Sequence, residues 1–165
     1  MEVKVINKSK SPLPQYACIG DAGLDLRADF SDPNFQPIGA GLDVVGDENA
    51  TIESITLNPG GRVLIPTRLH MAIPEGYELQ VRSRSGLAIK KGIFVLNSPG
   101  TVDAGYRDSV GVILANFSAE PFTIKQGDRV AQAVLNKFEH IDWKPVDDLD
   151  ETDRDGGFGH TDGWQ

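Results

Sequence analysis

The stretch at positions 109–117, SVGVILANF, limits the fold of this chain most, because both of its faces would be apolar in an extended strand. One face would carry Val110, Val112 and Leu114, and the other Gly111, Ile113, Ala115 and Phe117. Such a strand is expected to be buried. Short apolar stretches recur between glycine and proline turns, and only 85–91 suggests a short helical turn. The sequence therefore predicts an all-β fold.

Turn-forming residues indicate where the other strands are expected. Two hairpins are predicted, 51–57 with 61–65 around Asn58-Pro59-Gly60-Gly61, and 69–73 with 77–81 around Pro74-Glu75-Gly76. Further strands are expected at 3–7, 121–124 and 129–138. Positions 29–49 are acidic and rich in turn residues, with 42–45 as the one candidate strand, and they are interpreted as a surface insertion.

Composition narrows the class of protein. A chain of 165 residues is expected to form one domain. Its formal net charge of −8 disfavours broad binding to nucleic acid or to an anionic membrane. Cys18 is the sole cysteine, so neither an intrachain disulfide nor a cysteine-based zinc site is expected. With no apolar run of signal-peptide or membrane-spanning type, the cytoplasm or another reducing intracellular compartment is the expected location.

Three stretches carry residues suited to chemistry. Asp103 lies in a turn between Gly100 and Gly105, just before the apolar strand, where a carboxylate can act as a general base or simply cap the turn. Positions 82–92 are the most basic part of the chain and suit either phosphate binding or a solvated loop. The glycine-rich C-terminus carries Arg154 and Phe158 and suits either a lid or a flexible tail.

Five stretches, taken in order, resemble the five motifs of the homotrimeric dUTPase family. They are AGLDL at 22–26, SRSGLA at 83–88, GTVDAGYR at 100–107, GDRVAQ at 127–132, and Arg154 with GGFG at 156–159. The resemblance implies a jelly-roll-like β-barrel over 1–150 and a flexible C-terminal lid over 151–165. It also implies a homotrimer whose active sites are shared between subunits, with the tail of one subunit completing the site of another.

The resemblance implies a role for each matching residue. Asp103 would orient and deprotonate the attacking water, Tyr106 would pack under the deoxyribose and exclude a 2′-OH, and Asn97 would face uracil. The phosphate-contacting positions would be Arg84, Ser85, Gly86 and Gln132. Arg154 would reach the terminal phosphate and Phe158 would stack on uracil, while Asp25 would organise polar groups near the site.

The implied reaction is hydrolysis of dUTP to dUMP and pyrophosphate by attack of water on the α-phosphorus. Mg²⁺ would be held by triphosphate oxygens and water, since the sequence has no obvious cluster of protein metal ligands. The chain departs from the family pattern at Ser83, where proline is usual, and at Asp108, where glycine is common. In the fifth motif, His160 and Asp162 depart from it, and the gap from Arg154 to Gly156 is one residue short.

Two other functions are compatible with the same scaffold. dCTP deaminase shares the fold and uses a glutamate on the strand after the third motif, but Ile113 stands at that position here and an aliphatic side chain cannot shuttle protons. A catalytically idle nucleotide sensor or regulatory protein is the second alternative. The presence of Asp103, Tyr106, Gln132 and Phe158 argues against a loss of activity.

Overall fold

The computed structural model describes residues 1–47 and 51–152, and this part of the chain contains ten strands and one short helix. In chain order they are β1 Lys4–Asn7, β2 Leu24–Arg27, β3 Ile38–Gly46, β4 Ile52–Ala72, β5 Tyr77–Arg82, α1 Ser85–Lys91, β6 Ile93–Val95, β7 Gly100–Val102, β8 Ser109–Asn116, β9 Phe122–Lys125 and β10 Arg129–Lys137. The predicted all-β class is confirmed, and so is the short helical turn at 85–91.

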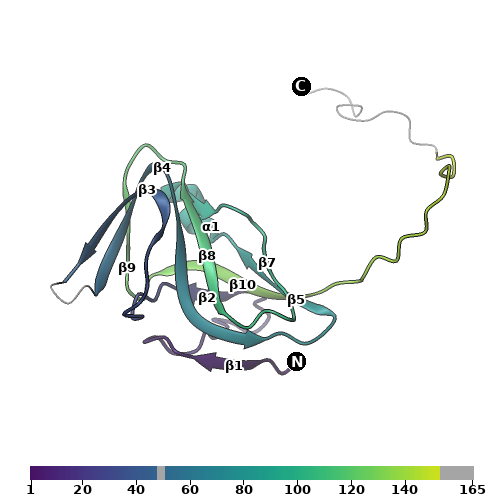
Figure 1. The fold of residues 1–165 in the computed structure, drawn as a ribbon, viewed down its shortest axis with the longest axis horizontal. Coiled ribbons are helices and arrows are strands. Elements are labelled where there is room, and N and C mark those ends of the chain that lie inside the picture. Colours follow the sequence, from purple (N-terminus) through teal and green to yellow (C-terminus); the bar gives the residue numbers. More distant parts are fainter. Residues whose placement is uncertain (48–50, 153–165) are drawn as a thin grey trace.

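The strands form two sheets around one core (Figure 1). One sheet has the order β1-β4-β8-β6, with β3 and β9 also paired to β4, and the other has the order β2-β10-β5-β7. Leu26 of β2, Val81 of β5 and Ile65 of β4 are buried in the same apolar cluster. This arrangement agrees with the jelly-roll-like fold that the resemblance implies.

Strand β8 is buried on one face, as predicted, but not on both. Val110, Val112 and Leu114 are at most 1% exposed and belong to the core. On the other face, Ala115 is 9% exposed, Gly111 and Ile113 are half-buried, and Phe117, just past the strand, is 87% exposed. The second apolar face of β8 is therefore only partly buried in the single chain.

The predicted hairpin around Asn58-Pro59-Gly60-Gly61 is wrong, because β4 continues through these residues (Figure 1). Strand β3 pairs with both halves of β4, through Leu42 with Leu57 and Ala40 with Arg62, and the register shifts between these two pairs. Gly60 has a φ of 74°, a conformation in which glycine is favoured. The Pro-Gly-Gly sequence thus forms an irregularity within one strand, because β3 supplies hydrogen-bond partners on both sides of it.

The second predicted hairpin is a turn between sheets. The Tyr77 N–H donates to the Pro74 carbonyl at 3.2 Å, so the turn forms where the sequence places it. The strand before it, β4, belongs to the larger sheet, however, and β5 belongs to the smaller one, where it pairs with β10 and β7. The turn therefore carries the chain from one layer to the other.

The interpretation of 29–49 as a surface insertion is wrong for its first residues. Asp29 is fully buried, Phe30 is 2% exposed, and the ring of Phe30 stacks on Phe35 with centroids 6.0 Å apart. Residues Ile38–Gly46 form β3, which is longer than the expected strand at 42–45 and is exposed apart from Leu42. Within the segment, β3 therefore lies on the surface.

Asp29 is a buried hub of hydrogen bonds that the sequence analysis missed. Its Oδ2 accepts from the Lys10 N–H at 2.7 Å and from Gln126 Nε2 at 2.8 Å, and its Oδ1 accepts from the Ser31 N–H at 3.0 Å and from the Ser31 hydroxyl. Burial alone would raise the pKa of this carboxyl, but the hydrogen bonds outweigh burial and hold its pKa below the usual 3.8. The ionised carboxylate therefore stabilises the fold.

Replacing Asp29 with asparagine is expected to lower the free energy of unfolding by about 1–3 kcal/mol at pH 7, because the amide NH₂ would face donors instead of accepting from them. A folded pKa below the unfolded value means that this stabilisation is complete above about pH 4 and is lost at lower pH. Urea unfolding should therefore show a gap between the two proteins that narrows as pH falls below 3.8. Asp142→Asn, in the exposed segment after β10, is the control, and an equal loss in it would contradict this assignment.

The described residues after β10, up to position 152, leave the sheets. The segment 139–152 is exposed throughout and extends away from the two layers (Figure 1). It includes Ile141, Trp143 and Leu149, which are 68%, 83% and 82% exposed. Within residues 1–47 and 51–152, no helix has the length and apolar character that crossing a membrane requires.

Candidate active site

The turn between β7 and β8 presents Asp103 and Tyr106. The Tyr106 N–H donates to the Asp103 carbonyl at 3.1 Å, and the Tyr106 hydroxyl donates to the Ser109 carbonyl at 3.1 Å. The Arg107 guanidinium donates to the Ala104 carbonyl at 2.6 Å and to the Tyr106 carbonyl at 2.8 Å. Asp103 is exposed and Tyr106 is 41% exposed. The turn is therefore fixed internally while both side chains stay accessible.

A pocket of about 250 Å³ lies beside this turn. Three of the predicted site residues, Asn97, Asp103 and Tyr106, line it together. Its other walls are mostly apolar and come from β4, β5, β7 and β8: Leu64, Val81, Gly100, Thr101, Val102, Ser109, Gly111 and Ile113. A Cβ on Gly111 would lie 2.7 Å from Leu64 Cδ1, so a larger residue there would displace the Leu64 side chain. The pocket offers an apolar surface with an amide and a carboxylate at its edge, which suits a flat polar ring.

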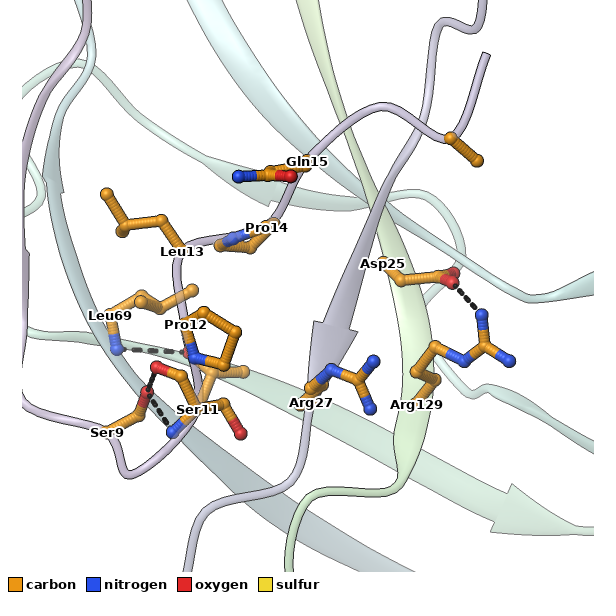
Figure 2. A pocket seen from close by; sticks show the side chains of 12 residues that line it. Ser9, Ser11, Pro12, Leu13, Pro14, Gln15, Asp25, Arg27, Leu69 and Arg129 are labelled. Carbon is orange, nitrogen blue, oxygen red and sulfur yellow. Dashed lines mark hydrogen bonds and ion pairs between the residues drawn. The ribbon is translucent and has the colours of Figure 1, made fainter.

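Asp25 forms ion pairs with two arginines on the outer face of the smaller sheet. Its Oδ1 accepts from Arg84 Nε at 3.0 Å, and its Oδ2 accepts from Arg129 Nη1 at 3.1 Å. Arg84 Nη1 also donates to the Arg129 carbonyl at 3.1 Å. Figure 2 shows Asp25 on β2 reaching Arg129 on the neighbouring strand β10. The Asp25 side chain lies on the opposite face of β2 from Leu26, which is fully buried.

Gln132 lies directly across from Asp25 in the pairing of β10 with β2. The two side chains line a recess of about 300 Å³ with Gln15, Ala17, Asp21, Ala22 and Gly23. On the other side of Asp25, a pocket of about 270 Å³ contains Arg27 and Arg129 (Figure 2). The Gln132 amide therefore stands at an open polar surface next to the arginine cluster.

Arg84, Ser85 and Gly86 lie at the start of α1. Arg84 occupies the N-cap position with extended dihedral angles, and Ser85 and Gly86 are exposed in the first turn. The preceding residue, Ser83, accepts a hydrogen bond from the Val95 N–H at 2.9 Å, so this departure from the family pattern ties the segment to β6. The segment that carries Arg84, Ser85 and Gly86 is thus fixed between the end of β5 in the smaller sheet and β6 in the larger sheet.

The predicted residues fall into two groups in the single chain. The pocket with Asn97, Asp103 and Tyr106 shares no lining residue with the recess that holds Asp25 and Gln132. Arg154 and Phe158 lie outside the described residues. Arg129 belongs to the fourth motif, but the motif resemblance predicted no role for it. The contact of Arg129 with Asp25 depends on the pairing of β2 with β10. This pairing joins positions about a hundred residues apart, so neither stretch alone indicates it.

The described residues also bear on metal binding. Across 1–47 and 51–152, no group of three or more His, Cys, Asp or Glu side chains is arranged to hold a metal ion. Both carboxylate oxygens of Asp25 already accept from arginines.

Comparison with known proteins supports one family. The sequence profile of the dUTPase family matches residues 29–162. Deoxyuridine 5′-triphosphate nucleotidohydrolase of Finegoldia magna is 48% identical over 162 residues, covering 98% of this chain and 99% of that protein. The enzyme of the same name from Fusobacterium nucleatum is 47% identical over 162 residues, covering 98% of this chain and 97% of that protein.

Solved structures agree on the fold. A variant of the dUTPase of Staphylococcus phage 80α has a TM-score of 0.74 at 22% identity, covering 96% of this chain and 97% of its own. A variant of the phage φ11 dUTPase, described with a structural Mg(II) ion, has a TM-score of 0.70 at 21% identity, covering 92% and 100%. The jelly-roll-like β fold is confirmed. The profile match and the two bacterial relatives show that this chain is a member of the dUTPase family.

Proposed function

We propose that this protein is a dUTP diphosphatase, which hydrolyses dUTP to dUMP and pyrophosphate by attack of water on the α-phosphorus. The observation that carries the proposal is the near 50% identity, over almost the whole chain, to two proteins named for this reaction. The pocket beside Asp103 supports it, because it combines a carboxylate, an amide and an apolar floor.

Uracil and deoxyribose bind in the pocket beside the turn. The Asn97 amide faces the edge of uracil, where it can both donate and accept a hydrogen bond. The Tyr106 ring packs under the deoxyribose and leaves no room for a 2′-OH, so it selects deoxynucleotides. Asp103 orients the attacking water and accepts its proton, a contribution of about 10²- to 10⁴-fold to the rate.

The triphosphate binds at the arginine cluster. Arg84, Ser85, Gly86 and Gln132 contact its oxygens, and Asp25 holds Arg84 in position through the 3.0 Å ion pair. When bound to the triphosphate oxygens and water, Mg²⁺ neutralises charge that develops in the transition state. From the C-terminal lid, Arg154 reaches the terminal phosphate and Phe158 stacks on uracil.

The active site is shared between subunits of a homotrimer. This assembly is supported by the two separate groups of site residues, since the pocket at Asp103 and the recess at Gln132 share no residue within one chain. It is also supported by the apolar residues left exposed in the segment 139–152. That segment crosses to another subunit, and residues 151–165 close its site. An intracellular, reducing location fits the exposed free thiol of Cys18.

The two alternatives have less support. Ile113 lines the pocket at the position where a deaminase would need a proton-transferring side chain. A nucleotide sensor without activity would not need the Asp103 carboxylate at the edge of the pocket. Neither alternative is favoured by the bacterial relatives, which are named as nucleotidohydrolases.

The decisive experiment measures pyrophosphate release from dUTP, dTTP, dCTP and UTP in the presence of Mg²⁺. We expect dUTP to be hydrolysed with a kcat/KM at least about 10²-fold above the other three, because both the base and the sugar are recognised. Ammonia release from dCTP is assayed in parallel. Sustained ammonia release would identify a deaminase, and binding of dUTP without any pyrophosphate would identify a sensor.

A further inference from the structure

Strand β4 carries a three-residue bulge opposite the start of β8. Pro66 pairs with Gly111 and His70 pairs with Ser109, so the three residues 67–69 of β4 lie opposite Val110 alone. The bulge therefore lies beside the start of β8, where the turn that presents Tyr106 ends. Bulges of this kind redirect side chains and are common beside functional sites.

The bulge is fixed by hydrogen bonds to β8. The buried Thr67 hydroxyl donates to the Val110 carbonyl at 2.7 Å, and the Arg68 N–H donates to the Ser109 hydroxyl at 2.9 Å. Arg68 has a φ of 55°, an unfavourable conformation for a residue with a side chain. Its guanidinium lies 3.6 Å from Asp32, at the start of the segment before β3. These contacts fix the backbone conformation of the residues immediately before His70.

His70 is the side chain that this bulge directs at the turn. Its Nδ1 lies 3.1 Å from the carbonyl oxygen of Arg107. A carbonyl can only accept, so Nδ1 carries the proton in this contact. The bonds of the Arg107 guanidinium stay within the turn, and the Tyr106 hydroxyl bonds the Ser109 carbonyl at the start of β8. The His70 contact is different, because it joins the carbonyl of Arg107 to a second strand, β4.

We propose that His70 is a positioning residue for nucleotide selection: it fixes the Arg107 carbonyl and thereby the placement of the Tyr106 ring at the pocket. This inference rests on the proposed function, in which Tyr106 excludes ribonucleotides. Without the bond, the turn keeps its internal contacts and the Tyr106–Ser109 bond, but the Arg107 carbonyl is no longer tied to β4, the strand that brings Leu64 to the pocket. A Tyr106 ring that is less firmly positioned excludes a 2′-OH less effectively.

The test compares kcat and KM for dUTP and for UTP in wild-type protein and in His70→Ala, His70→Asn and His70→Gln. The Asn amide nitrogen can occupy about the place of Nδ1, whereas the Gln amide lies one methylene farther out. We expect His70→Ala and His70→Gln to raise KM for dUTP and to lower the dUTP-over-UTP ratio of kcat/KM by about three- to tenfold. His70→Asn should restore most of that ratio. Glu53→Ala, at an exposed position near the other end of the same strand β4, is the control and should leave it unchanged.

The outcomes separate this inference from the proposed function. If wild-type protein releases no pyrophosphate from dUTP, the proposed function fails. If it hydrolyses dUTP but His70→Ala keeps the wild-type ratio, only the role of His70 is overturned, even if its melting temperature falls. A loss of the ratio in His70→Asn as large as that in His70→Ala would also overturn it, because the donor would then not be what matters.

Discussion

Asp103→Asn is expected to lower kcat for dUTP by about 10²- to 10⁴-fold and to leave nucleotide affinity within a few fold of wild type. Asparagine fills the same space but cannot accept a proton from water at neutral pH. The side chain is exposed at the edge of the pocket, so the substitution disturbs no buried contact. Single-turnover kinetics and equilibrium binding of a non-hydrolysable dUTP analogue would measure the two quantities separately.

Asp108→Asn is the matched control, since Asp108 is an exposed carboxylate in the same turn and does not line the pocket. It should retain turnover close to that of wild type. Wild-type-like hydrolysis by Asp103→Asn would refute the general-base assignment. Equal losses in both variants would mean that the charge of the turn, and not one carboxylate, governs the rate.

Removing residues 151–165 is expected to lower dUTP turnover by at least about 10²-fold, because the site loses the arginine and the aromatic ring that close over the nucleotide. The melting temperature should change little, since every residue of the core cluster precedes position 136. Turnover and thermal unfolding measured on the same preparation would test both statements.

A shorter truncation after Thr161 separates tail length from the motif, because it keeps Arg154 and the glycines at 156, 157 and 159. It is expected to retain most of the activity, whereas Arg154→Ala in the full chain should lose much of it. An unchanged rate after removal of 151–165 would show that the tail is no lid.

The sequence was sufficient to predict where most strands lie, because apolar alternation and turn residues are local properties. The strands predicted at 3–7, 121–124 and 129–138 match β1, β9 and β10 to within one or two residues. Pairing was harder to predict. The Asn58-Pro59-Gly60-Gly61 sequence looks like a hairpin turn, and it became an irregularity within β4 because β3, placed earlier in the chain, pairs across it.

The candidate site was predictable where its residues form continuous motifs. The turn with Asp103 and Tyr106 and the segment with Arg84 were both found in this way. Arg129 and Asp29 were missed as partners, because their contacts join residues distant in sequence: Arg129 with Asp25, and Asp29 with Gln126. No local pattern distinguishes such a residue from an ordinary surface charge.

The 21-residue strand β4 has a consequence for how the chain folds. It pairs with its sequence neighbour β3 and also with β1, β8 and β9, whose residues range from Lys4 to Lys125, so much of the larger sheet is built from contacts distant in sequence. Closing such long loops precedes the gain from pairing, which makes folding slow. During synthesis, β4 leaves the ribosome with β8 and β9 still unmade, and its β8-facing edge stays open until at least residue 116 has emerged. In that interval, an unpaired apolar edge is accessible to chaperones and to other nascent chains.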